Sequence, residues 1–182
     1  MPFPLFHRAA FAAAICLAPT VSLAQEVFGT INATLDGAER SWFLTSQDNE
    51  SQTFGLTIAI ANLQSFSLWG QPNAESVKTF DDTLLLSFDV MSVGGQVIPL
   101  NISLIYLADG WTSGWLADEA DNIVFTLKTL EQSDDGVLVE GRFEALAYYR
   151  EPLSSGEVDT SREMQINGSF SATLPSFTLQ ER

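Results

Sequence analysis

Residues 83–107 read TLLLSFDVMSVGGQVIPLNISLIYL, and this stretch decides the fold. In its first half apolar residues recur at every second position, namely at Leu84, Leu86, Phe88 and Val90. A period of two places alternate side chains on opposite faces of a β-strand. Gly94-Gly95 then marks a tight turn, and a second alternating run continues to Leu107. The stretch therefore predicts a hairpin of two long antiparallel strands with one buried face.

The same period recurs along the chain and predicts about nine strands. The other alternating runs lie at residues 30–35, 42–44, 56–61, 66–69, 123–127, 137–147 and 164–174. Asp36-Gly37 and residues 133–136 are hairpin turn signals. We expect a single helical turn at residues 115–120 and no amphipathic helix. The chain is thus predicted to fold as one all-β domain over residues 25–182, an antiparallel β-barrel or β-sandwich built mostly as a meander.

Three strand residues carry more specific expectations. Pro99 has no N–H to donate, so it predicts a sheet edge or a bulge. Gly141 and Gly168 open two similar stretches, GRFEA and GSFSA, and predict either a kink in the strand or a place where a bulky neighbour lies close to it. If the run at 30–35 pairs with the run at 164–174, the sheet closes into a barrel and loses its edges.

Residues 1–24 have the three parts of a secretory signal peptide. The segment begins with a basic region at Arg8, continues through an apolar run, and ends with small residues at Ser22 and Ala24. Its apolar run is too short for a membrane span. We therefore expect export and cleavage before Gln25, with a periplasmic or extracellular location. The exported chain would contain no cysteine, which favours a bacterial envelope.

Removal of that segment leaves 158 residues without histidine or cysteine, since His7 and Cys16 both lie within it. Catalysis by Ser-His-Asp or Cys-His groups, disulfides and the usual zinc, haem and iron-sulfur ligands are thereby excluded. The remaining seven Lys and Arg face 23 acids, a net charge of −16. Nucleic acid is a poor partner for such a chain. We predict no cofactor.

Carboxylates are the general acids and bases that remain. Most of them fall in predicted turns, where Asp is favoured for local hydrogen bonds. Asp118, Glu119 and Asp121 supply oxygen ligands for a metal, but they lack the spacing of a calcium loop. A short cap followed by a turn explains them better. No metal site is therefore predicted, and a solvated role is favoured for the acids.

Aromatic residues are the predicted ligand-binding feature. Trp111 and Trp115 flank a short polar stretch after Tyr106, and Trp69 ends an earlier strand. All four are candidate ligand-binding residues, and the two loop residues Trp111 and Trp115 are suited to stack on a sugar ring or to gate the mouth of a barrel. The other interpretation, which the usual burial of large aromatic side chains favours, is that Trp111 and Trp115 fold inward as a lid over one end of the core.

The preferred function is non-enzymatic binding of a small ligand, a sugar or an apolar molecule, or of an envelope protein. In strand number, size and export the chain is similar to lipocalin-like barrels, but none of its Trp residues follows a Gly by two positions, and we assign no family. A small outer-membrane β-barrel is the first alternative, although no stable membrane insertion is expected. A carboxylate-dependent hydrolase is the second.

Overall fold

Eleven β-strands and one 3-10 helix make up the part of the chain that the computed structural model describes, residues 25–181 apart from 59–61, 77, 119–121 and 155. The predicted signal peptide lies outside the described residues. The strands are β1 (Glu26–Leu35), β2 (Ala38–Ser46), β3 (Phe54–Ile58), β4 (Leu63–Gly70), β5 (Thr83–Val93), β6 (Gln96–Leu107), β7 (Gly114–Ala117), β8 (Ile123–Ser133), β9 (Gly136–Arg150), β10 (Val158–Pro175) and β11 (Leu179–Glu181). The 3-10 helix η2 (Ser176–Thr178) precedes β11. Among these residues no helix is long and apolar enough to cross a membrane.

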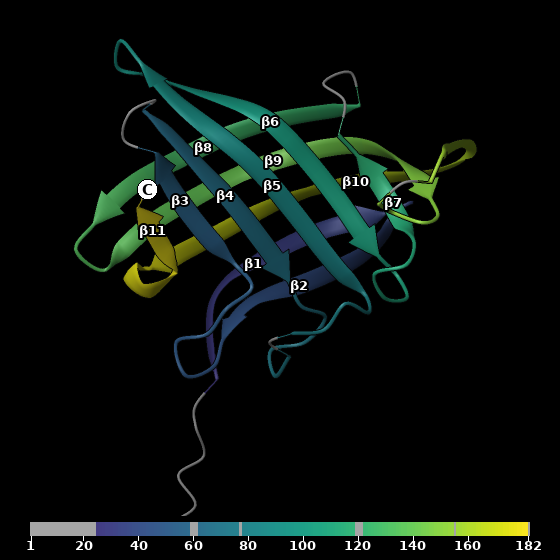
Figure 1. Ribbon diagram of the computed structural model, residues 1–182, viewed down its shortest axis with the longest axis horizontal. Helices are drawn as coiled ribbons and strands as arrows, with labels where there is room; N and C mark the ends of the chain where they lie inside the picture. Colours follow the sequence, from purple (N-terminus) through teal and green to yellow (C-terminus); the bar gives the residue numbers. More distant parts are fainter. Residues whose placement is uncertain (1–24, 59–61, 77, 119–121, 155, 182) are drawn as a thin grey trace, which may run out of the picture.

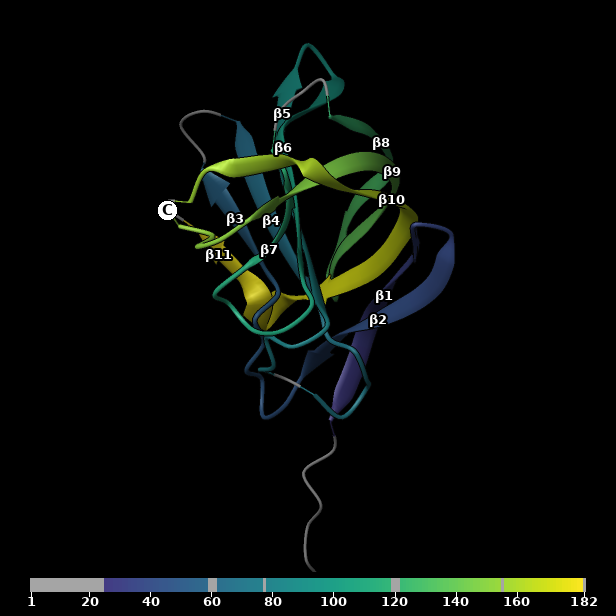
Figure 2. The same cartoon turned by 90° about the vertical axis from the view of Figure 1, so that its right-hand side faces the viewer.

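All eleven strands belong to one sheet. Its order is β11-β3-β4-β5-β6-β7-β9-β10-β1-β2. The remaining strand, β8, pairs with a different part of β9 on the same side as β7. Neighbours are antiparallel, except that β11 runs parallel to β3. The sheet is strongly bent, so that β3 to β6 cross over β8, β9, β10 and β1 (Figure 1). The view turned by 90° shows these two halves facing each other (Figure 2).

The core lies between the two halves and is filled with side chains. Phe88 of β5 contacts Phe125 of β8 and Phe170 of β10, with ring centroids 4.9 and 5.7 Å apart. Phe66 of β4 stacks on Phe88 from the same half. The inward residues predicted for the first half of the stretch 83–107, Leu84, Leu86, Phe88 and Val90, are buried here, whereas Ile98 near the start of β6 is 45% exposed. Burial of these apolar surfaces is the main force that holds the halves together.

β7 connects the two halves at one end of the molecule. It pairs with Leu104–Tyr106 of β6 on one side and with Tyr148–Arg150 of β9 on the other. The first part of β6 pairs with β5 alone among the described strands. Pro99 lies in this unpaired edge, close to a register shift between Ser87 and Asp89, as the sequence predicts.

The all-β class and the mostly meander order are confirmed, but the predicted barrel is wrong. β1 does pair with β10, yet among the described residues the backbone of β2, the strand next to β1 at this end of the sheet, pairs with the other half only at an isolated bridge between Phe43 and Gln71. The strand count is eleven rather than nine because β7 and β11 span only four and three residues. Runs of that length are too short to show alternation. The helical turn expected at 115–120 is also wrong, since residues 114–117 form β7.

The hairpin predicted at Asp36-Gly37 is confirmed. Both residues have positive φ, 47° and 86°, which is the conformation of a tight two-residue hairpin turn. The turn sets the β1–β2 register and places Ile31 opposite Trp42, both of them buried. The indole of Trp42 needs the space at Gly70, where a Cβ atom would lie 2.6 Å from the Cβ of Trp42.

Candidate functional site: an exposed aromatic cluster

The structure separates the four predicted ligand-binding aromatics into two groups on opposite faces of the sheet. Trp69 is the register partner of Leu85 on the outer face, next to the inward-facing Leu84. Tyr106 and Trp115 are register partners of each other on the inner face. Trp111 lies in the β6–β7 connection and contacts Trp69. The four residues therefore do not form one site.

The inner group closes one end of the core. Tyr106 is only 6% exposed, and its ring packs on Trp42 at 6.2 Å and on Trp115 at 5.9 Å. Trp115 in turn contacts Tyr149 at 5.3 Å, and the guanidinium carbon of Arg162 lies 3.3 Å from the Tyr149 ring centroid. Trp115 thus takes the inward lid position that the sequence left open as an alternative.

Asp82 anchors this inner group through three contacts. The Tyr106 hydroxyl donates to Oδ1 of Asp82 at 2.8 Å, and Arg40 pairs with Oδ2 at 2.9 Å. The indole N–H of Trp42 donates to the backbone carbonyl of Asp82 at 2.8 Å. Burial, reinforced by the hydrogen bond to Asp82 and its negative charge, raises the pKa of Tyr106 to about 12. Tyr106 is therefore a neutral hydrogen-bond donor, which suits a structural role.

The outer aromatic cluster consists of Trp69, Phe80 and Trp111. The two indole rings stack with centroids 5.7 Å apart and planes inclined by 14°. Phe80 meets both edgewise, at 5.9 Å from Trp69 and 5.7 Å from Trp111. These are favoured aromatic geometries. The end of β4, the β4–β5 connection and the β6–β7 connection thus bring their rings to one spot.

Hydrogen bonds fix Trp69 against the sheet, whereas Phe80 and Trp111 remain exposed. The indole N–H of Trp69 donates to Oγ of Ser67 at 3.1 Å, and its backbone N–H donates to Oγ1 of Thr53 at 2.9 Å. Leu85 beside it is only 8% exposed although it lies on the outer face. In contrast, Trp111 is 48% exposed and Phe80 is 41% exposed. Ring surface is thus held rigidly and left open to solvent.

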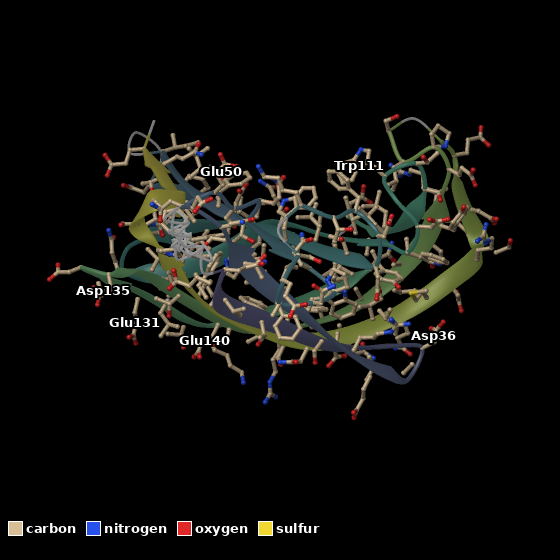
Figure 3. All side chains as sticks on the ribbon, turned by 90° about the horizontal axis from the view of Figure 1, so that it is seen from below. Asp36, Glu50, Trp111, Glu131, Asp135 and Glu140 are labelled. Carbon is tan, nitrogen blue, oxygen red and sulfur yellow. The ribbon has the colours of Figure 1, made fainter. Side chains whose placement is uncertain are left out.

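Polar groups surround the cluster. Asp81 lies close to Gly110, the residue before Trp111. A Cβ atom added to Gly110 would be 3.7 Å from a carboxylate oxygen of Asp81. Ser87 donates to Ser67 on the outer face below Trp69. Figure 3 shows Trp111 on the side of the molecule opposite to the acidic residues Glu131, Asp135 and Glu140. The cluster therefore combines apolar rings with hydrogen-bonding groups at its rim.

The hollows formed by the described residues are either small or open to solvent, so they do not suit an enclosed ligand. A cavity between β3, β4, β11 and the β8–β9 end has a volume of only about 50 Å³, whereas ligand pockets span roughly 300–1,000 Å³. A wide, open depression of about 630 Å³ lies along β1 and β10. It is open to solvent over most of its extent and so does not enclose a ligand.

The predicted metal candidates form no centre in the described part of the chain. Asp118 is exposed in the connection after β7, and Glu119 and Asp121 lie outside the described residues. Within those residues no three His, Cys, Asp or Glu side chains are grouped to hold a metal ion.

Phe80 and Asp82 were missed by the sequence analysis. Phe80 follows a stretch predicted to be a loop, and single aromatics in loops carry no period. A usable signal was the run Phe80-Asp81-Asp82, which comes directly before the buried strand β5. An aromatic at that position is held close to the sheet by the strand that follows it.

The described residues define an all-β protein with one open sheet and an exposed aromatic cluster on its outer face. Comparison with protein-family models, with curated proteins and with solved structures gave no match. Its function is therefore inferred from the residues of this chain.

Proposed function

We propose that this protein is an exported, non-enzymatic binding protein that holds a carbohydrate on its outer aromatic cluster. The observation that carries the proposal is the half-exposed indole of Trp111, stacked on Trp69, which is itself fixed by hydrogen bonds. The C–H groups of a sugar ring pack on an aromatic face, and its hydroxyls need nearby polar partners. Trp111 offers such a face and Asp81 lies at its rim.

A surface site is favoured over an internal one. The space between the halves is occupied by phenylalanine rings such as Phe88 and Phe125. An apolar ligand of ordinary size would need most of its surface buried. A sugar binds well on an open surface because its hydroxyls can stay hydrated while one face stacks.

A protein partner fits the cluster less well than a sugar does. A standard protein interface covers about 800 Å² on each partner and has an apolar centre. Phe80 and Trp111 are the two rings exposed at the cluster, whereas the other large apolar side chains that are exposed in the described chain belong to β1, β3, β5, β6, β8, β10 and η2. Two rings are enough to stack on a sugar but make a small centre for a protein interface.

The test is saccharide binding by the mature chain and by its Trp111→Ala variant. Isothermal titration with cellohexaose, chitohexaose and laminarihexaose, together with soluble peptidoglycan fragments, provides a defined panel. We expect saturable binding of at least one of them, weakened roughly tenfold or more by Trp111→Ala. Because Trp111 is half exposed, the variant should unfold at nearly the same denaturant concentration as the parent.

Phe177→Ala is the matched control. Phe177 is an exposed aromatic on η2 that is not among the ring contacts of Trp69, Phe80 and Trp111, so its removal should leave the affinity unchanged. Failure of every saccharide to bind the parent chain, or equal affinity of parent and Trp111→Ala, would overturn the proposal. Binding of a purified envelope protein that depends on Trp111, without saccharide binding, would favour the protein partner instead.

A further inference from the structure

A row of hydroxyls lies beside the aromatic cluster on the outer face of the sheet. Ser67, Ser87 and Ser103 are register partners on β4, β5 and β6. Trp69 and Leu85 belong to a parallel row on the same face. Each lies two residues along its strand from Ser67 or Ser87, so the two rows are about 7 Å apart. At its β3 end it meets Phe54, an exposed aromatic opposite Ser67. The serine row, the aromatic cluster beside it and Phe54 at its end therefore form one continuous strip.

Two of the three serines are exposed enough to contact a ligand. Ser67 is mostly covered and already accepts hydrogen bonds from the Trp69 indole and from Ser87. Ser87 and Ser103 are partly exposed. A hydroxyl both donates and accepts hydrogen bonds, as a sugar hydroxyl does. The two serines thus match the chemistry of a second sugar unit placed next to the first.

The strip is almost uncharged although the protein is strongly acidic. Asp89 is the only charged residue in β4, β5 and β6, all of whose residues the structure describes. Its carboxylate accepts a hydrogen bond from the Asn101 amide at 2.7 Å. The net charge of −16 for residues 25–182 repels polyanions. No Lys or Arg on these strands offsets that repulsion.

We propose that the site continues from Trp69 and Trp111 onto Ser87 and Ser103, and that its ligand is a neutral glycan chain rather than a single sugar or an acidic polysaccharide. This inference rests on the proposed function. Each hydrogen bond to a neutral hydroxyl contributes modestly. Two further hydrogen bonds are expected to strengthen binding roughly tenfold over a monosaccharide.

The experiment is a length series for the mature chain. Glucose, N-acetylglucosamine and the cello-, chito- and laminari-oligosaccharides up to the hexamer are titrated at low and at moderate NaCl. We expect affinity to rise roughly tenfold or more with length and to be insensitive to salt. The double variant Ser87→Ala/Ser103→Ala should lose most of the gain with length and keep monosaccharide binding. The matched control Ser169→Ala/Ser171→Ala alters β10, outside the strip, and should keep that gain.

The outcomes separate the two proposals. If hexamers bind no better than monomers, or if Ser87→Ala/Ser103→Ala keeps the full length dependence, the extended site is wrong while binding at Trp111 can still stand. Tighter binding of polygalacturonate than of the neutral hexamers would overturn the neutral class. Loss of every saccharide signal, or no effect of Trp111→Ala, removes the proposed function and the extended site together.

Discussion

Gly141 of β9 and Phe170 of β10 are register partners, and the phenyl ring of Phe170 occupies the space that a side chain on Gly141 would need. A Cβ atom on Gly141 would lie 2.6 Å from Cζ of Phe170 and 2.7 Å from the carbonyl oxygen of Thr126. Gly168 and Phe143 repeat the arrangement with a contact of 2.8 Å. Each glycine thus lets a ring of the neighbouring strand lie flat in the core.

Gly141→Ala should destabilise the fold by about 1–3 kcal/mol through overpacking. Phe170 packs on Phe88 and Phe125, and the Thr126 oxygen is backbone, so neither can move aside freely. The free energy of unfolding in urea measures the effect. Gly55→Ala is the control, because its nearest contact is a methyl of Leu179 at 3.2 Å. Equal losses in the two variants would contradict the packing argument.

Local patterns predicted much of this fold, and long-range geometry accounts for the rest. Alternation at Leu84 to Val90 marked the buried face of β5, and the two GxF stretches predicted the close contacts at Gly141 and Gly168. Closure of the sheet into a barrel would require β2, its end strand, to pair along its length with a strand of the other half. No local sequence pattern encodes such a long-range pairing. Trp111 and Trp115 lie four residues apart, yet they fall on opposite faces because Trp115 belongs to β7 whereas Trp111 lies in the connection before it. A strand of four residues is too short to be recognised by its period.

Asp82 should couple more strongly to Tyr106 than to Arg40. The Arg40 pair is exposed to solvent on both sides, so its coupling energy should be about 0.2–1 kcal/mol. The Tyr106 hydrogen bond is partly buried and charge-assisted, and should contribute about 1.5–3 kcal/mol. Asp82→Asn is the variant at this position, because Asp82 has a positive φ of 50° and Asn tolerates that conformation. Double-mutant cycles with Arg40→Gln and Tyr106→Phe test the order, and the reverse order would show that the surface pair dominates.

The exported protein should begin at Gln25. Expression of residues 1–182 in a Gram-negative host should yield a chain of 158 residues in the soluble periplasmic fraction without detergent. Intact mass spectrometry identifies the N-terminus. Ala24→Arg removes the small residue before the cut and should leave the precursor unprocessed. Processed protein that is recovered only with detergent would support the outer-membrane alternative.

Stability should fall in strongly alkaline solution because of Tyr106. Its pKa rises from the ordinary value of 10.0 to about 12 in the folded protein, with burial as the main cause. Between these two pH values the unfolded chain loses the phenolic proton while the folded chain keeps it. The contribution of Tyr106 is therefore complete below pH 10 and is lost as the pH rises toward 12. Tyr106→Phe should flatten this part of the profile of melting temperature against pH.

Tyr149→Phe is the matched control for that profile. The Tyr149 hydroxyl donates to Glu151 at 2.7 Å at an exposed position, so this variant should keep the alkaline loss of the parent. Below pH 10 Tyr106→Phe should lower the melting temperature more than Tyr149→Phe, because it leaves Asp82 without a partly buried donor. An alkaline profile unchanged by Tyr106→Phe would mean that other groups cause the loss, and that the Tyr106–Asp82 contact does not hold the inner aromatic group in place.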